Sequence, residues 1–130
     1  MVRCRRYMQG KNLLRAKNKR LKIYIAGPYT ASSKREILMN VNNAIDVGIR
    51  VWEKGHYPYI PHLTHFVKAR PEFKLLWKDF IEWNRPWIDC CDALLYLRKS
   101  KGADIEKEYA QSKEKMIFKS LKEIPTVLRY

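Results

Sequence analysis

Residues 93–106 read ALLYLRKSKGADIE, and this stretch decides the fold. Its first five residues form an apolar run of strand length, and the small-residue turn at Gly102 opens a helical pattern. A strand that leads through a turn into a helix is half of a βαβ unit, the building block of parallel sheets. Such a turn also leaves backbone N–H groups at a helix start, which is a favourable place for an anion.

Residues 21–30 read LKIYIAGPYT and predict a second buried strand that runs into a turn. Gly27 lets the backbone approach a ligand closely, and Pro28 fixes the shape of the turn. A helix is predicted over residues 33–55, where the capping box SKRE opens it and a glycine closes it. Residues 56–61 then predict a short strand whose two prolines favour an irregular or edge position.

The next segment predicts a loop over residues 62–72 and a helix over residues 73–83. Pro86 interrupts that helical pattern. Because Asn84 is a good N-cap and proline is tolerated in a first turn, we expect a separate short helix over residues 85–91.

After the strand at residues 93–97, a helix is predicted to reach residue 121 and a last strand to occupy residues 125–128. Strands separated by helices imply parallel βαβ units with right-handed crossovers. We therefore expect an α/β fold: a three-layer open parallel sheet, Rossmann/flavodoxin-like, of four to five strands in the order 2-1-3-4. Ligands bind such sheets where the strand order reverses. That point lies beside residues 27–29 and 98–106.

The composition predicts a single globular domain over residues 21–130. The chain has 130 residues, of which 46% are hydrophobic and 31% charged. Its apolar runs are too short to span a bilayer, and no secretory signal is recognisable. Three cysteines, two of them adjacent, indicate no disulfide framework, so we expect a cytoplasmic location.

The formal net charge of +14 at pH 7 attracts anions such as phosphate, nucleic acid or an acidic surface. Residues 1–20 contain no acidic residue and form a basic N-terminal extension. Such an extension is either a nucleic-acid contact or a simple tail. Met8 is an alternative first residue.

Three features, taken in order, resemble the nucleoside 2-deoxyribosyltransferase-like superfamily, which includes N-glycosidases of nucleoside 5'-monophosphates. They are the strand before Gly27-Pro28-Tyr29, the approach Trp87…Cys91-Asp92-Ala93-Leu94 to a central strand, and the turn Ser100-x-Gly102-x-x-x-Glu106. The resemblance covers residues 21–128. It implies an α/β enzyme that acts on a nucleoside or nucleotide without a cofactor.

The resemblance gives Glu106 the role of nucleophile. Its carboxylate would attack the anomeric carbon and form a glycosyl-enzyme intermediate, as in retaining glycosidases. Ser100 would contact a 5'-phosphate together with the N–H groups around Gly102, and Tyr29 would line the sugar and base. The positions of these residues alone also fit simpler roles. Glu106 is then a first-turn acid kept ionised by the helix dipole, Ser100 is a cap serine, and Tyr29 is a loop tyrosine over the core edge.

Asn84 stands where the superfamily has an aspartate, eight residues before Asp92. An amide can bond a ribose hydroxyl, but it cannot deliver a proton as an acid does. Asp89, Asp92 and Asp104 are then candidates for the missing acid. Asp104 is close enough in sequence to Glu106 to touch a sugar hydroxyl, whereas Asp92 is interpreted as a structural residue before the strand.

His62 and His65 form half of a possible metal site, but no third ligand follows at a suitable spacing, so we expect no metal. The loop that carries them is instead a candidate contact for base or phosphate. Trp77, Trp83 and Trp87 recur at helical spacing and are interpreted as core or dimer packing rather than a nucleic-acid stacking platform. Superfamily members typically pair their subunits, which implies a homodimer or a larger homo-oligomer.

The predicted function is cleavage or transfer of the N-glycosidic bond of a nucleoside or nucleoside 5'-monophosphate. The candidate catalytic residues are Glu106, Asn84 and Asp104, and the candidate substrate contacts are Gly27, Pro28, Tyr29, Ser100 and Gly102. Two alternatives stay open. One is a catalytically silent nucleotide-binding protein, and the other is a basic module that binds nucleic acid through its N-terminal arm.

Overall fold

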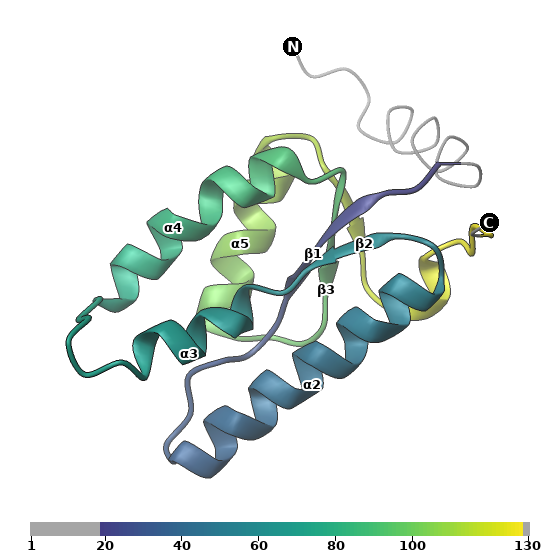
Figure 1. Ribbon diagram of the computed structural model, residues 1–130. Helices are drawn as coiled ribbons and strands as arrows, with labels where there is room; N and C mark the ends of the chain where they lie inside the picture. The colour runs from purple at the N-terminus through teal and green to yellow at the C-terminus, as the bar shows by residue number, and fades with distance from the viewer. Residues whose placement is uncertain (1–18, 129–130) are drawn as a thin grey trace.

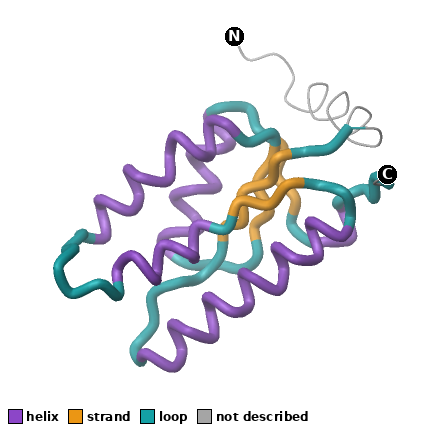
Figure 2. Tube along the Cα trace, viewed as in Figure 1, coloured by secondary structure: helices purple, strands orange, loops and turns teal. Residues whose placement is uncertain are grey.

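The computed structural model describes residues 19–128 and shows four strands wrapped by helices (Figures 1 and 2). The strands are β1 (Lys22–Ala26), β2 (Tyr57–Tyr59), β3 (Ala93–Tyr96) and β4 (Met116–Phe118). The α-helices are α2 (Lys34–Glu53), α3 (His65–Lys68), α4 (Trp77–Cys90) and α5 (Lys101–Ser112). Two short 3₁₀ helices, η1 (Pro61–Thr64) and η2 (Leu121–Glu123), complete the described part of the chain.

The strands form one all-parallel sheet in the order β2-β1-β3-β4. Figure 1 shows α2 on one face of this sheet and α4 with α5 on the other. The α/β open-sheet fold and the strand order predicted from the sequence are therefore confirmed. β1 lies between β2 and β3, so the strand order reverses at β1.

Two apolar clusters fill the spaces on either side of the sheet, and β1 contributes to both of them. Ile23 and Ile25 belong to the cluster that contains buried residues of α2, whereas Tyr24 and Ala26 belong to the cluster that contains buried residues of α4 and α5. This alternation is the two-residue period of a strand with both faces covered. Burial of each large aliphatic side chain stabilises the fold by about 1.5–3 kcal/mol.

The start of α2 confirms the expectation from the sequence. The Ser33 hydroxyl oxygen accepts a hydrogen bond from the Glu36 N–H at 3.2 Å, as an N-cap should. The helix then runs for 20 residues and ends just before Gly55, whose φ of +98° lies in the left-handed region that favours glycine.

Helix α4 corrects the prediction of two separate helices. It runs without a break through Pro86, and Asn84 lies inside it rather than at an N-cap. Pro86 lacks the N–H that would bond the Glu82 carbonyl, but both residues lie on the exposed side of the helix. Water can bond the carbonyl there, so the proline is tolerated. The helix also begins at Trp77 rather than at residue 73.

The last strand is also corrected. Residues 116–118 form β4, whereas the sequence pattern assigned them to a helix and placed the strand at residues 125–128. The helix α5 ends at Ser112, and Glu114 follows with a φ of 59°, a left-handed turn that redirects the chain. A three-residue apolar run fits either periodicity, so its tertiary partner β3 decides the outcome.

The segment predicted as a loop over residues 62–72 contains most of η1 and all of α3. These short helices carry His62 and His65 beside the carboxyl end of β1. The basic extension at residues 1–20 lies almost entirely outside the described residues. Among the described helices, none combines the length and apolar character needed to cross a membrane.

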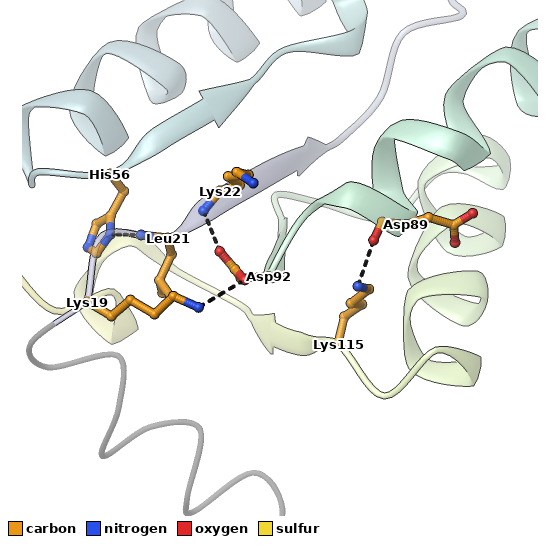
Figure 3. A network of polar contacts seen from close by, with 7 residues as sticks. All are labelled: Lys19, Leu21, Lys22, His56, Asp89, Asp92 and Lys115. Atoms are coloured by element: carbon orange, nitrogen blue, oxygen red, sulfur yellow. Dashed lines mark hydrogen bonds and ion pairs between the residues drawn. The ribbon is translucent and has the colours of Figure 1, made fainter.

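Side chains of His56 and Asp92 bond backbone groups at the amino ends of the strands (Figure 3). His56 is fully buried; its Nδ1 accepts from the Leu21 N–H at 3.0 Å, and its Nε2–H donates to the Pro125 carbonyl at 2.5 Å. The Asp92 carboxylate accepts from the Lys22 N–H at 2.9 Å. This contact supports the interpretation of Asp92 as a structural residue before β3.

We predict that Gly55→Ala strongly destabilises the protein. A Cβ at this position would lie 1.9 Å from the Val127 carbonyl oxygen, on a backbone with a φ that alanine rarely adopts. The free energy of unfolding should fall by about 2–4 kcal/mol in urea denaturation. Gly102→Ala is the matched control, since its Cβ would meet nothing within 4 Å. Equal stability losses in the two variants would contradict this account of Gly55.

Candidate functional site

A pocket of about 610 Å³ opens where the strand order reverses. Its walls come from the loop after β1, from η1, α3 and α4, and from the first turns of α5. The location agrees with the rule that open parallel sheets bind ligands beyond the carboxyl ends of their strands. Six of the predicted site residues line it: Gly27, Tyr29, Asn84, Ser100, Gly102 and Glu106.

Glu106 lines this pocket with only 8% of its surface exposed. The Tyr24 hydroxyl donates to Glu106 Oε2, and Asn84 Nδ2 donates to the same oxygen at 3.2 Å. Among the described residues, no group bonds the other carboxyl oxygen, Oε1. The carboxyl group is thus held through one oxygen while the second is left for a ligand.

Burial raises the pKa of Glu106 from its ordinary value of 4.5 to about 7, against the opposing effect of the hydrogen bonds from Tyr24 and Asn84. This corrects the expectation of an acid kept ionised by the helix dipole. Helix α5 begins at Lys101, so Glu106 belongs to its second turn and faces the core, beyond the reach of that dipole effect. At neutral pH the carboxyl group is therefore poised between its two protonation states.

Tyr24 is a site residue that the sequence analysis missed. It is fully buried in β1, and its pKa is raised well above 10.0, first by burial and then by the charge of Glu106. Its hydroxyl therefore stays protonated and remains a donor to the carboxylate. The available signal was a single polar aromatic residue within the aliphatic strand KIYIA.

Asn84 reaches Glu106 from α4, across the contact between α4 and α5. The residue is 7% exposed, and its Oδ1 atom is buried without a hydrogen-bond partner among the described residues. An unpaired buried carbonyl is costly, on the order of 1–3 kcal/mol, and native structures contain few of them. The amide thus carries an acceptor with no partner on the wall of a pocket.

His62 is the second site residue whose role the sequence did not specify. It is 5% exposed, and its Nε2 lies 3.1 Å from the Gly27 carbonyl and 3.2 Å from the Pro28 carbonyl. Carbonyl oxygens only accept, so Nε2 carries the proton and Nδ1 is an acceptor. Burial lowers the pKa of His62 below 6.5, which keeps the ring neutral. Nδ1 is buried without a partner in the described structure.

The start of α5 also contributes to the lining of the pocket. The Ser100 hydroxyl oxygen accepts from the Ala103 N–H at 3.0 Å, so Ser100 is the N-cap. The N–H groups of Lys101 and Gly102, the first two of the helix, have no intrahelical acceptor. Because an added Cβ on Gly102 would meet nothing within 4 Å, this backbone stands open to the pocket.

Two lysines and several aromatic rings complete the walls. Lys101 Nζ lies 4.8 Å from the centre of the Trp77 ring, and Lys68 Nζ lies 5.4 Å from that of Tyr29 and 5.6 Å from that of Phe80. Cation–π contacts of this kind hold the ammonium groups over the rings while leaving their charge available. The pocket therefore combines flat apolar surfaces with positive charge.

Two predicted residues, Asp104 and Pro28, are not among the residues that line the pocket, and Gly27 has a packing role as well. Asp104 does not line the pocket; its carboxylate accepts from the Tyr96 hydroxyl at 2.5 Å and lies 4.0 Å from Lys99 Nζ. Pro28 contributes its carbonyl to His62 rather than a pocket surface. Gly27 lines the pocket, but a Cβ there would come within 2.9 Å of the Leu97 side chain, so packing as well as ligand access favours glycine.

The two histidines of the suspected half metal site have separate partners. His65 Nδ1 lies 2.8 Å from the Tyr29 hydroxyl, whereas His62 bonds backbone carbonyls. Within residues 19–128, no group of three or more histidine, cysteine or acidic side chains is arranged to hold a metal ion.

The tryptophans of α4 are not core residues, which corrects that part of the prediction. Trp77, Trp83 and Trp87 are 43%, 38% and 47% exposed. Trp87 stacks on Tyr59 with ring centres 5.3 Å apart, and Tyr59 stacks on Tyr24 at 5.6 Å. A ladder of aromatic rings thus runs from the surface of α4 to the hydroxyl that holds Glu106.

We predict that Glu106 makes the protein less stable as the pH rises. The unfolded chain ionises this group from about pH 4.5, whereas the folded state keeps the proton until about pH 7. Between these values the folded state should lose stability on the order of 2–3 kcal/mol relative to the variant Glu106→Gln. Urea unfolding at pH 5 and pH 8 would measure the difference. The exposed control Glu108→Gln should follow the wild type, and a Glu106→Gln variant with the wild-type pH dependence would refute the assignment.

Comparison with known proteins identifies the family of the chain. A family model described as "Domain of unknown function (DUF4406)" matches residues 21–119, which is most of the 130-residue chain and includes every wall of the pocket. No curated protein matches the sequence. The chain therefore belongs to the DUF4406 family.

Proposed function

We propose that this protein cleaves or transfers the N-glycosidic bond of a nucleoside or nucleoside 5'-monophosphate. The observation that carries the proposal is the carboxyl group of Glu106, which lines the pocket and is held through Oε2 by Tyr24 and Asn84. A carboxylate fixed in this way presents its other oxygen to a ligand at one angle. The resemblance to nucleoside deoxyribosyltransferases supports the same role.

In the proposed reaction, Glu106 Oε1 bonds the anomeric carbon of the sugar as the bond from that carbon to the base breaks. The base leaves with the bonding electron pair and takes a proton from water in the open pocket, because no second carboxyl group lines the described walls. A water molecule then attacks the same carbon, its proton neutralises the hydroxide left when the base was protonated, and Glu106 is released as a carboxylate. A second base in place of water gives transfer instead of hydrolysis.

The rest of the pocket suits the two ends of a nucleotide. The open N–H groups of Lys101 and Gly102 at the start of α5, with the Lys68 and Lys101 ammonium groups, favour a phosphate. The rings of Tyr29, Trp77 and Phe80 offer flat surfaces on which a base can stack. Glu106 lies in the same cavity, where the sugar between these two groups would sit.

Base release tests the proposal directly. We predict that the protein at pH 8, above the raised pKa of Glu106, liberates free base from at least one member of a panel of ribo- and deoxyribonucleosides and their 5'-monophosphates. Glu106→Gln should lower the rate by at least about 10³-fold, since it removes the nucleophile. Chromatography of the products measures the release. The control Asp92→Asn, at the other end of the sheet, should retain the activity.

Retention of base release by Glu106→Gln would refute the role of this residue. Tight nucleotide binding without release, even when an acceptor base is added, would instead identify a catalytically silent nucleotide-binding protein.

The phosphate site can be tested through Gly102. We predict that Gly102→Ala lowers kcat/KM for nucleoside 5'-monophosphates by about tenfold, because its methyl group would stand in the open space beside the helix start. Nucleosides without phosphate should change by less than about twofold, since they make no use of that contact. The ratio of the two kcat/KM values is the measurement. Equal losses on both classes of substrate would show that no phosphate lies against this turn.

A further inference from the structure

The inner part of the pocket presents hydrogen-bond acceptors without partners. Asn84 Oδ1 and His62 Nδ1 are the two buried side-chain polar atoms that lack a partner in the described structure, and both residues line this one cavity. Glu106 adds Oε1, a further acceptor. Unpaired buried acceptors are rare, and two of them in the walls of one pocket favour a ligand with donor groups.

The orientation of the Asn84 amide follows from chemistry. Glu106 Oε2 already accepts from the Tyr24 hydroxyl, and a carboxylate oxygen offers no proton. In the ionised form of Glu106, the Nδ2 group of Asn84 therefore donates in the 3.2 Å contact with that oxygen. The carbonyl oxygen of the amide is left as the unpaired atom, on the residue that donates to the carboxyl group that would bond the sugar.

From this arrangement we infer that the pocket selects ribose over 2'-deoxyribose, because Asn84 Oδ1 accepts a hydrogen bond from the 2'-hydroxyl of the sugar. The inference rests on the proposed function for its placement of the anomeric carbon at Glu106. The hydroxyl on the neighbouring carbon then falls beside the residue that bonds Glu106. A hydrogen bond to this hydroxyl strengthens in the transition state of glycoside cleavage.

His62 supports the same inference from another wall of the pocket. Its neutral ring is fixed by the Gly27 and Pro28 carbonyls, so Nδ1 is a buried acceptor without a partner in a residue that lines the pocket. A ribose ring carries two neighbouring hydroxyl donors, whereas deoxyribose carries one. Asn84 Oδ1 and His62 Nδ1 can therefore each accept from one hydroxyl of ribose. With deoxyribose, one of these two buried atoms stays unpaired.

The first experiment compares paired substrates. Base release is measured for the four common ribonucleoside 5'-monophosphates and their 2'-deoxy counterparts, with the wild type and with Asn84→Leu and Asn84→Asp. We expect the wild type to prefer ribose by about ten- to a hundredfold in kcat/KM, the usual effect of one buried hydrogen bond. Asn84→Leu, which removes the acceptor, should reduce the preference to within about threefold.

Asn84→Asp keeps a carboxyl oxygen in the place of Oδ1, so it should keep the ribose preference even where its overall rate differs. Asp92→Asn, at the amino end of β3, controls for lost stability and should also keep the preference. A wild type that accepts deoxyribose equally or better would overturn the inference while leaving the glycosidase proposal intact.

The second experiment measures binding without turnover. Glu106→Gln retains an oxygen for Tyr24 and Asn84 to bond, and calorimetry with this variant compares a ribonucleotide, its 2'-deoxy form and its 2'-fluoro-2'-deoxy form. Fluorine matches the hydroxyl in size but donates no hydrogen bond, so both analogues should bind about tenfold or more weakly.

The two experiments separate the two proposals. Ribose-selective binding that Asn84→Leu abolishes, in a protein that releases no base, would refute the glycosidase activity and support the sugar recognition. Binding without preference among the three sugars would refute the sugar recognition, whether or not base is released.

Discussion

The parallel pairing of β1 with both β2 and β3 is the constraint on which the rest of the structure depends. A right-handed crossover to either side of one strand forces the connecting helices onto opposite faces of the sheet. The connections then diverge at the carboxyl end of β1 and leave space between them. Gly27 borders that space after β1, and the start of α5 borders it after β3. The order of the strands therefore creates the space for the pocket, whichever side chains line it.

Much of the fold could be predicted because local signals and tertiary packing agree there. The buried strand before Gly27, the cap at Ser33 and the left-handed Gly55 each specify their conformation within a few residues. The failures occur where local signals were ambiguous. Pro86 normally interrupts a helix, but its exposed position makes the lost hydrogen bond inexpensive. Residues 116–118 fit two periodicities, and pairing with β3 decided between them.

The candidate site could be predicted only in part, for a related reason. Glu106 and Ser100 were found because they share one short turn-to-helix segment. Asn84 was found through a resemblance, although its expected place at a helix start was wrong. The roles of Tyr24 and His62 depend on contacts between segments far apart in the chain. In the sequence, Tyr24 resembles a core residue, and His62 resembles half of a metal site. Sequence periodicity carries no information on which buried polar atom lacks a partner.

The two ends of the sheet differ in how well their polar groups are paired. At the amino ends of the strands, His56 and Asp92 satisfy backbone groups with hydrogen bonds of 3.0 and 2.9 Å (Figure 3). At the carboxyl ends, Asn84 Oδ1 and His62 Nδ1 have no hydrogen-bond partner within residues 19–128. In the terms of energy-landscape theory, local frustration is concentrated at the carboxyl ends of the strands, whereas the contacts at the amino ends stabilise the fold. Side chains at the carboxyl ends can therefore change during evolution with little loss of fold stability, so that one fold can acquire new ligands.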